Sequence, residues 1–197
     1  SIEICEWHKI VKVIFKQMLE CIKYIHSKGV CHYDISLENW LINDVGVNVE
    51  QTDDGTTRAT FCIDEVQIKL CDFGLAERFV GEHSFVSNKF CGKSRYESPE
   101  IVSRKNNFNA KSNDIWCLGV CLFMMIVGGA AWNQASVKDS GFRRIMYDKN
   151  GLFEIVRSWD RLAYIDENLI FLFESIFKYE ENRSDLGEIE MHSWMHI

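Results

Sequence analysis

The segment from Ile115 to Trp132 constrains the fold of this chain most strongly, because it carries no charged side chain. Its length approaches that of a membrane-spanning helix, which needs about 20 predominantly apolar residues. However, Asp114 bounds it directly, a glycine pair interrupts its end, and no basic residue follows until Lys138. These flanks lack the positive residues that anchor a membrane helix. We therefore predict no membrane span but a central helix that is buried on all sides.

The composition is that of an ordinary folded domain with a negative net charge. The chain has 197 residues, of which 47% are hydrophobic and 26% are charged. This length predicts a single domain with a substantial core. The formal net charge is -7, and no cluster of Lys and Arg runs against it, so we predict no nucleic-acid partner.

Eight cysteines are spread over the chain, and none forms a C-x-x-C pair. Most lie in apolar stretches, which is typical of reduced, buried thiols rather than of a disulfide framework or a zinc site. Residues 1–10 include Glu3 and Glu6 and lack the layout of a signal peptide. We expect a cytoplasmic location, although a signal in a longer parent chain would permit export.

The remaining pattern predicts a mainly α fold with a small β ribbon. Apolar residues at three- and four-residue steps predict a first helix over residues 6–26. Two alternating runs flank Asp53-Asp54-Gly55 and predict a β-hairpin over residues 45–63. Separate short strands are expected at residues 40–42 and 66–70. Later helices are expected near residues 115–127, 142–146, 152–158, 167–177 and 186–192.

The stretch from Cys31 to Asn39 carries the residues with the clearest chemistry. It places His32 just before Asp34 and ends with Asn39. A carboxylate and an amide held in this way can orient a hydroxyl group and bind a hard cation, which is what phosphoryl transfer requires of a protein. The stretch resembles the catalytic loop of protein kinases, H-R-D-L-x-x-x-N.

Further motifs follow in the order in which protein kinases carry them. Asp72–Gly74 follows a predicted strand and matches the metal-binding D-F-G motif. Ser98–Glu100 matches A-P-E except for its serine, and Asp114 lies in a segment similar to D-x-W-S-x-G-V. Arg183 and the closing His192–Trp194 resemble the family's last arginine and H-P-W. The chain is thus identified as the C-terminal lobe of a protein kinase, spanning residues 1–197, with residues 72–100 as its activation segment.

The resemblance implies reactive and ligand-binding roles at the matching positions. Asp34 would accept the proton of the substrate hydroxyl or orient that hydroxyl. Asn39 and Asp72 would hold Mg2+ that bridges the phosphates of ATP, and Leu41 would lie under the adenine.

The same resemblance implies supporting residues. His32 and Phe73 would stack, and Asp114 would brace the catalytic loop from the central helix. Glu100 would form a buried ion pair with Arg183. These residues would hold the site without reacting.

Tyr33 stands where active kinases commonly carry an arginine. That arginine pairs with a phosphorylated activation segment, and a tyrosine cannot neutralise a phosphate. Phosphorylation of Ser84, Ser87 or Ser94 is therefore expected to matter little.

Ser36 stands where Ser/Thr kinases have a lysine that reaches the transferred phosphate. Tyrosine kinases use an arginine at the position of Glu38, so the loop offers no cation. Lys93 stands where the family usually has a threonine close to the catalytic aspartate. Two interpretations remain open, namely that Lys93 supplies the missing charge as a catalytic group or that it points to solvent.

No G-x-G-x-x-G and no V-A-I-K strand occur ahead of the catalytic loop. We therefore expect the N-terminal lobe to be absent, and the chain to be a kinase fragment that is inactive alone. An uncovered apolar surface near Leu41 and Phe73 would favour self-association.

The interval between Asn39 and Asp72 is longer than in most kinases, and the surplus is the predicted hairpin, an insertion over residues 45–64. It would be a docking arm or a tolerated surface insertion, and the second is favoured. The segment from Gly92 to Glu100, together with the missing loop lysine, also resembles FIKK-type kinases of apicomplexan parasites.

The leading hypothesis is a serine/threonine protein kinase that acts on protein substrates. The alternative is a pseudokinase or scaffold lobe that binds protein partners without transferring phosphate. Retention of Asp34, Asn39 and Asp72 favours the enzyme, whereas loss of the two basic loop residues favours the alternative.

Overall fold

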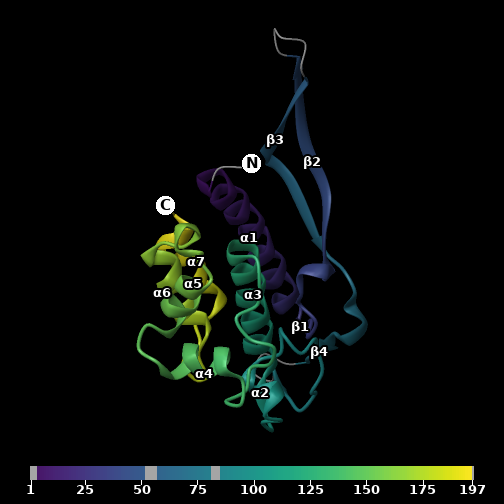
Figure 1. Ribbon diagram of the computed structural model, residues 1–197. Coiled ribbons are helices and arrows are strands. Elements are labelled where there is room, and N and C mark those ends of the chain that lie inside the picture. Colours follow the sequence, from purple (N-terminus) through teal and green to yellow (C-terminus); the bar gives the residue numbers. More distant parts are fainter. Residues whose placement is uncertain (1–3, 52–56, 81–84, 197) are drawn as a thin grey trace.

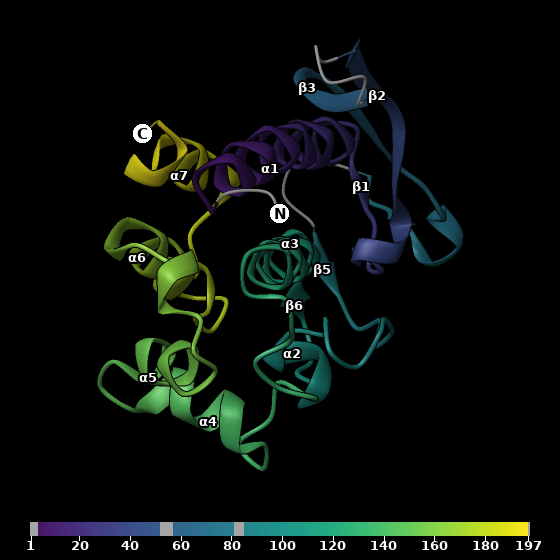
Figure 2. The same ribbon diagram turned by 45° about the horizontal axis from the view of Figure 1, so that its top comes forward.

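Two long helices form the centre of the protein, whose computed structural model describes residues 4–51, 57–80 and 85–196. Helix α1 (Ile4–Ser27) packs against α3 (Ala110–Val127). Helices α4 to α7 lie on one side of this pair and the β-hairpin lies on the other (Figures 1 and 2). The further helices are α2 (Pro99–Val102), α4 (Ser140–Tyr147), α5 (Gly151–Ser158), α6 (Glu167–Ile176) and α7 (Leu186–Met191). The expectation of a mainly helical fold is confirmed.

Helix α3 contains most of the uncharged segment. The side chain of Asn109 caps it by accepting hydrogen bonds from the backbone N–H groups of Lys111 (2.9 Å) and Ser112 (3.3 Å). Because this cap precedes the uncharged segment, the helix begins earlier than expected, at Ala110. Among the described residues, α3 is the one helix long and apolar enough to cross a membrane, but 78% of it is buried inside the protein. The interpretation as a core helix is confirmed.

Aromatic side chains fasten α3 to the helices beside it. The ring of Trp116 lies 5.3 Å from that of Trp132 and 5.2 Å from that of Phe177, centroid to centroid. Gly119 allows α6 to approach α3 closely, since a Cβ at this position would lie 2.4 Å from Cγ2 of Ile176. A side chain at Gly119 would therefore force the two helices apart.

The described strands form three antiparallel two-stranded sheets. The pairs are β1 (Val30–Cys31) with β4 (Glu77–Arg78), β2 (Trp40–Gln51) with β3 (Thr57–Leu70), and β5 (Val86–Ser87) with β6 (Phe108–Asn109). Strands β2 and β3 form a long hairpin that projects beyond the helices (Figure 1).

The hairpin is longer than expected. Its antiparallel pairing is confirmed, but the expectation of separate strands at residues 40–42 and 66–70 is wrong. Both are the base of β2 and β3, which continue across register shifts between Ile42 and Gly46. The predicted turn at residues 53–55 lies outside the described residues.

Gln17 of α1 holds the base of this hairpin. Its Nε2 donates to the backbone oxygen of Val66 (2.7 Å), and its Oε1 accepts from the backbone N–H of Ile68 (3.1 Å). One amide thereby satisfies two polar groups on the outer edge of β3, which no other strand covers among the described residues.

Candidate active site

The loop that follows β1 is anchored from α3 by Asp114, whose side chain is fully buried. Its Oδ2 accepts a hydrogen bond from the backbone N–H of His32 (2.8 Å) and lies 2.9 Å from Nε2 of His26. Its Oδ1 accepts from the backbone N–H of Tyr33 (2.9 Å), a residue with an unusual φ of 67°. A buried carboxylate needs such partners. Together they fix the backbone that leads directly into Asp34.

The side chains of His26, Cys31 and Asp114 place ligand-type atoms within 4.8 Å of one another. Both oxygens of Asp114 are already engaged by the loop, as described above. Burial, and then the Asp114 charge, raise the pKa of the Cys31 thiol, which disfavours the thiolate that a metal would need. This group therefore braces the loop and is not a metal site.

Asp34 and Asn39 face each other across the loop. Nδ2 of Asn39 donates to the backbone oxygen of Asp34 (2.7 Å) and to its Oδ2 (3.0 Å). Because the amide nitrogen makes both bonds, the amide oxygen of Asn39 is the atom that could bind a cation. The Asp34 side chain is 12% exposed, so a substrate can reach it.

Asp72 is placed beside this loop by its neighbour in the chain, since the backbone N–H of Cys71 donates to the backbone oxygen of Asn39 (2.9 Å). The backbone of Asp72 is left-handed, with φ 61° and ψ 70°. Its Oδ1 accepts from the backbone N–H of Gly74 (3.2 Å), and the side chain is exposed. This carboxylate is therefore open to a ligand.

The rings of His32 and Phe73 meet edge to face, with centroids 4.8 Å apart. Nε2 of His32 also lies 3.1 Å from the backbone oxygen of Cys71. The structure thus brings together the two residues expected to stack. Leu41 lies at the base of β2, and Leu41 and Phe73 are 52% and 47% exposed.

Lys93 reaches the loop of residues 31–39, the predicted catalytic loop, from the predicted activation segment of residues 72–100. Its Nζ donates to Oγ of Ser36 (2.6 Å) and lies 3.4 Å from Oδ2 of Asp34 and 3.9 Å from Oε2 of Glu38. Gly92 permits this approach, because its φ is 134° and a Cβ there would lie 3.0 Å from a backbone oxygen of the loop. The ammonium therefore lies against the loop, in the place where the loop itself has no cation.

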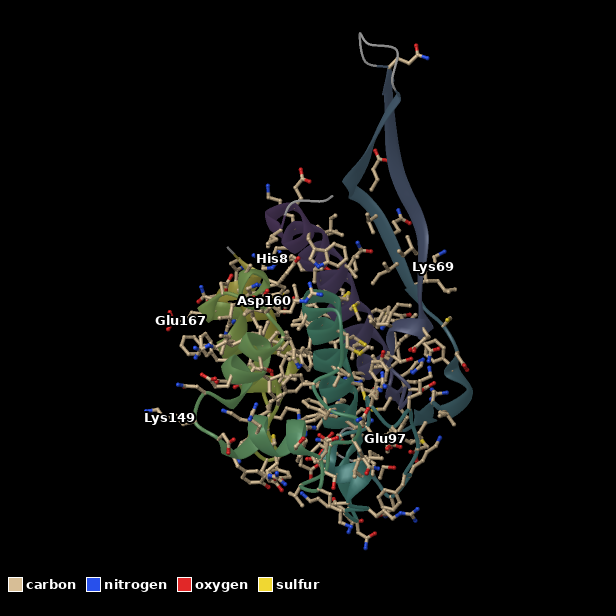
Figure 3. All side chains as sticks on the ribbon, viewed as in Figure 1. His8, Lys69, Glu97, Lys149, Asp160 and Glu167 are labelled. Atoms are coloured by element: carbon tan, nitrogen blue, oxygen red, sulfur yellow. The ribbon has the colours of Figure 1, made fainter. Side chains whose placement is uncertain are left out.

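Two carboxyl groups near Lys93 have shifted pKa values. A hydrogen bond from its own backbone N–H, followed by the Ser36 hydroxyl and the Lys93 ammonium, lowers the pKa of Glu38. Burial raises the pKa of Glu97, which lies near α2 (Figure 3). Glu38 thus adds a negative charge at the rim of the site.

Glu77 is a member of this region that sequence reasoning missed. The hydroxyl of Tyr33 donates to its Oε2 (2.9 Å). Burial raises the pKa of Tyr33, and a buried tyrosine needs a partner for its O–H. Tyr33, which stands where kinases commonly carry an arginine, was therefore the one sequence signal that a hydrogen-bond acceptor lies nearby.

The end of the activation segment is held by Glu100 and Arg183, whose side chains are 2% and 0% exposed. Nη2 of Arg183 lies 3.1 and 3.0 Å from the two carboxylate oxygens. Its Nη1 donates to the backbone oxygen and the hydroxyl of Ser112 (2.8 and 2.9 Å). Burial lowers the pKa of Arg183, and the Glu100 charge opposes that shift. The pair joins α2 to the start of α3.

Residues 4–195 match the family described as the protein kinase domain. The DNA damage response protein kinase DUN1 of Saccharomyces cerevisiae is 29% identical over 93% of this chain and 34% of its own length. The serine/threonine-protein kinase dkf-1 of Caenorhabditis elegans is 33% identical over 95% of this chain and 22% of its own length. Testis-specific serine/threonine-protein kinase 2 of Mus musculus is 27% identical over 94% of this chain and 45% of its own length. The chain spans less than half the length of each of these relatives.

Proposed function

Because this chain belongs to the protein kinase family, we propose that, within a longer kinase, it transfers the γ-phosphate of ATP to serine or threonine hydroxyls of protein substrates. The arrangement at Asp34 carries this proposal. Its Oδ2 lies 3.0 Å from the amide nitrogen of Asn39 and 3.4 Å from the ammonium of Lys93. These two groups hold the carboxylate in one orientation, from which it can align a substrate hydroxyl and take its proton.

The donor atoms near Asp34 fit Mg2+, the metal that accompanies ATP in kinases. Mg2+ prefers oxygen ligands, and the amide oxygen of Asn39 and the exposed carboxylate of Asp72 supply them. When bound, the metal would offset the negative charge of the phosphates. The left-handed backbone at Asp72 would direct its carboxylate, and the bond from Asn39 to Asp34 would keep the amide in register.

In this proposal, Lys93 supplies the positive charge that a loop lysine supplies in other serine/threonine kinases. Its ammonium lies 2.6 Å from Oγ of Ser36, the residue that stands at the lysine position. A positive charge there would face the phosphate as it is transferred, which is where electrostatic stabilisation is most effective. The charge would thus come from the activation segment instead of the loop.

Nucleotide binding requires more residues than this sequence contains, since it has no G-x-G-x-x-G. Leu41 and Phe73 also leave apolar surface uncovered, at 52% and 47% exposure. We propose that an N-terminal lobe covers this surface, and that the isolated chain is inactive and self-associates through it. The finer resemblance to FIKK-type kinases rests on residues 92–100 and Ser36 alone.

A scaffold that binds proteins without transferring phosphate is the second candidate. Tyr33 and Ser36 favour it, because both stand where an active kinase carries a basic residue. The oxygen-bearing residues Asp34, Asn39 and Asp72 have no evident use in a scaffold, so the enzyme is the better account.

Phosphate transfer from ATP to a protein substrate by the full-length parent distinguishes the two candidates. Wild-type protein should transfer phosphate, and Asp34→Asn should slow the transfer roughly a hundredfold or more, because the proton acceptor is lost. Asp160→Asn changes an exposed aspartate after α5 and should retain the wild-type rate. Transfer by neither wild type nor variant would favour the scaffold, and an Asp34→Asn variant as fast as wild type would contradict the role of Asp34.

A further inference from the structure

Glu77 of β4 joins the catalytic loop to the activation segment through a single oxygen. Its Oε2 accepts hydrogen bonds from the hydroxyl of Tyr33 (2.9 Å) and from Oγ of Ser87 on β5 (3.1 Å). Tyr33 is 1% exposed and Ser87 is 5% exposed. Hydrogen bonds to a carboxylate at such a site are stronger than those between neutral groups.

Lys89 extends this connection along the activation segment. Its backbone N–H donates to Oγ of Ser87 (3.1 Å), which itself donates to Glu77. Its Nζ bonds to the backbone oxygen of Leu75 (2.5 Å) and lies 5.3 Å from the centre of the Tyr33 ring. A continuous chain of hydrogen bonds therefore runs from Lys89 through Ser87 and Glu77 to Tyr33.

Tyr33 is held at both its backbone and its side chain. Its backbone N–H binds Oδ1 of Asp114 at 2.9 Å, and its hydroxyl binds Glu77 at 2.9 Å. The ring also meets that of Phe108 at 6.3 Å, on the strand that pairs with β5. Asp34 follows Tyr33 directly, so each of these contacts bears on where the Asp34 carboxylate lies.

We propose that Glu77 is a positioning residue that holds the activation segment against the catalytic loop without phosphorylation of the segment. This inference rests on the proposed function, because it assigns Glu77 to the reaction of Asp34. A phosphate on Ser87 would bring a second negative charge to the Glu77 carboxylate and break the link. Tyr33 serves here as a neutral donor to an acidic partner on the neighbouring strand.

A double-mutant cycle in the full-length parent tests the link between Tyr33 and Glu77. Tyr33→Phe and Glu77→Ala should each lower kcat about tenfold and leave the KM for ATP unchanged, because orientation is lost and nucleotide contacts are not. The double variant should lose no more than Glu77→Ala alone, which is the signature of a direct link between Tyr33 and Glu77. Ser87→Ala is a milder third variant, and Tyr24→Phe, at an exposed tyrosine of α1, is the matched control with wild-type kcat.

Amide hydrogen exchange over residues 85–91 supplies a readout that does not depend on activity. Tyr33→Phe, Glu77→Ala and Ser87→Ala should each exchange faster there than wild type. This holds even if the wild-type parent transfers no phosphate and the proposed function fails. Phosphatase treatment of the wild-type parent should leave kcat unchanged. The proposal is overturned by additive losses in the cycle, by unchanged exchange in Tyr33→Phe, or by a loss of kcat on phosphatase treatment.

Discussion

The Lys93 ammonium connects two segments that are far apart in the sequence and that together form the proposed reactive centre. It contacts Ser36 at 2.6 Å and Asp34 at 3.4 Å, and its side chain is 41% exposed. A partly exposed ion pair of this kind contributes little to stability, typically below about 1 kcal/mol. Lys93 should therefore matter for the rate of phosphate transfer far more than for folding.

Replacing Lys93 by methionine should slow phosphate transfer roughly a hundredfold, because no other cation lies on the loop. The double variant Ser36→Lys with Lys93→Thr should recover most of the rate, since it returns an ammonium to the same place from the opposite segment. Single-turnover transfer by the full-length parent measures both. Lys138→Met, at an exposed lysine, is the control, and full activity of Lys93→Met would show that the charge comes from elsewhere.

Tyr96 should make the free energy of unfolding fall at high pH. Burial raises the pKa of Tyr96 from 10.0 to about 12, and its hydroxyl accepts a hydrogen bond from the backbone N–H of Leu37 in the catalytic loop (3.4 Å). Between these two pH values the unfolded chain releases the proton and the folded protein keeps it. The stabilisation is therefore complete below pH 10 and is lost as the pH rises towards 12.

The free energy of unfolding measured against pH tests this expectation. Wild-type protein should lose stability with rising pH above pH 10, and the slope should be shallower in Tyr96→Phe, which has no proton to release there. The loss of the hydroxyl itself changes stability by the same amount at every pH below 10, so the slope isolates the ionisation. An equal slope in the two proteins would contradict the assignment.

Residue types and their order predicted which side chains would lie together at the candidate site. Asp34, Asn39 and Asp72 were expected to hold the chemistry, and the structure places them on the catalytic loop and beside it, as described above. Glu77 could not be predicted in this way, because it belongs to no motif and its partner Tyr33 is distant in the sequence. Which acceptor a buried hydroxyl finds depends on the tertiary packing of β1 against β4.

The hairpin of β2 and β3 is held to the body by α1 through the side chain of Gln17. A two-stranded hairpin is marginally stable by itself in water, so its contact with α1 decides its direction. The two bonds from Gln17, at 2.7 and 3.1 Å, engage the edge of β3 at Val66 and Ile68.

Replacing Gln17 by alanine should lower the free energy of unfolding by about 1–3 kcal/mol, because a partly buried N–H and a carbonyl of β3 lose their partner. Amide exchange at Ile68 should also quicken. Gln67→Ala changes an exposed glutamine of β3, between Val66 and Ile68, and controls for the loss of an amide side chain. If both variants have wild-type stability, Gln17 does not hold the hairpin.

The success of sequence reasoning differed between kinds of element. Periodicity over many residues predicted α1, the uncharged segment predicted α3, and an Asp-Gly turn between alternating runs predicted the hairpin. Strands β1, β4, β5 and β6 have two residues each, which is too short to show any alternation. They form because α1, the catalytic loop and the activation segment are brought together by tertiary packing.

At the scale of the whole molecule, the helices form a body around α3, and the reactive loop lies where α1 ends (Figure 2). The uncharged segment predicted a buried central helix, and the family resemblance implied that Asp114 on this helix would brace the catalytic loop, to whose backbone it is indeed bonded. The side chains that remain exposed there, Leu41 and Phe73, belong to the surface where we propose that a further lobe binds. In this proposal the chain supplies half of a nucleotide site and the further lobe supplies the rest.

ATP turnover by the 197-residue chain alone, compared with that of the full-length parent under the same conditions, tests this claim most directly. We expect the parent to turn over ATP and transfer phosphate, with the Asp34→Asn parent as the background. The chain alone should not exceed that background, because its sequence contains no G-x-G-x-x-G loop to cover the phosphates. Turnover by the isolated chain at the rate of the parent would contradict the account.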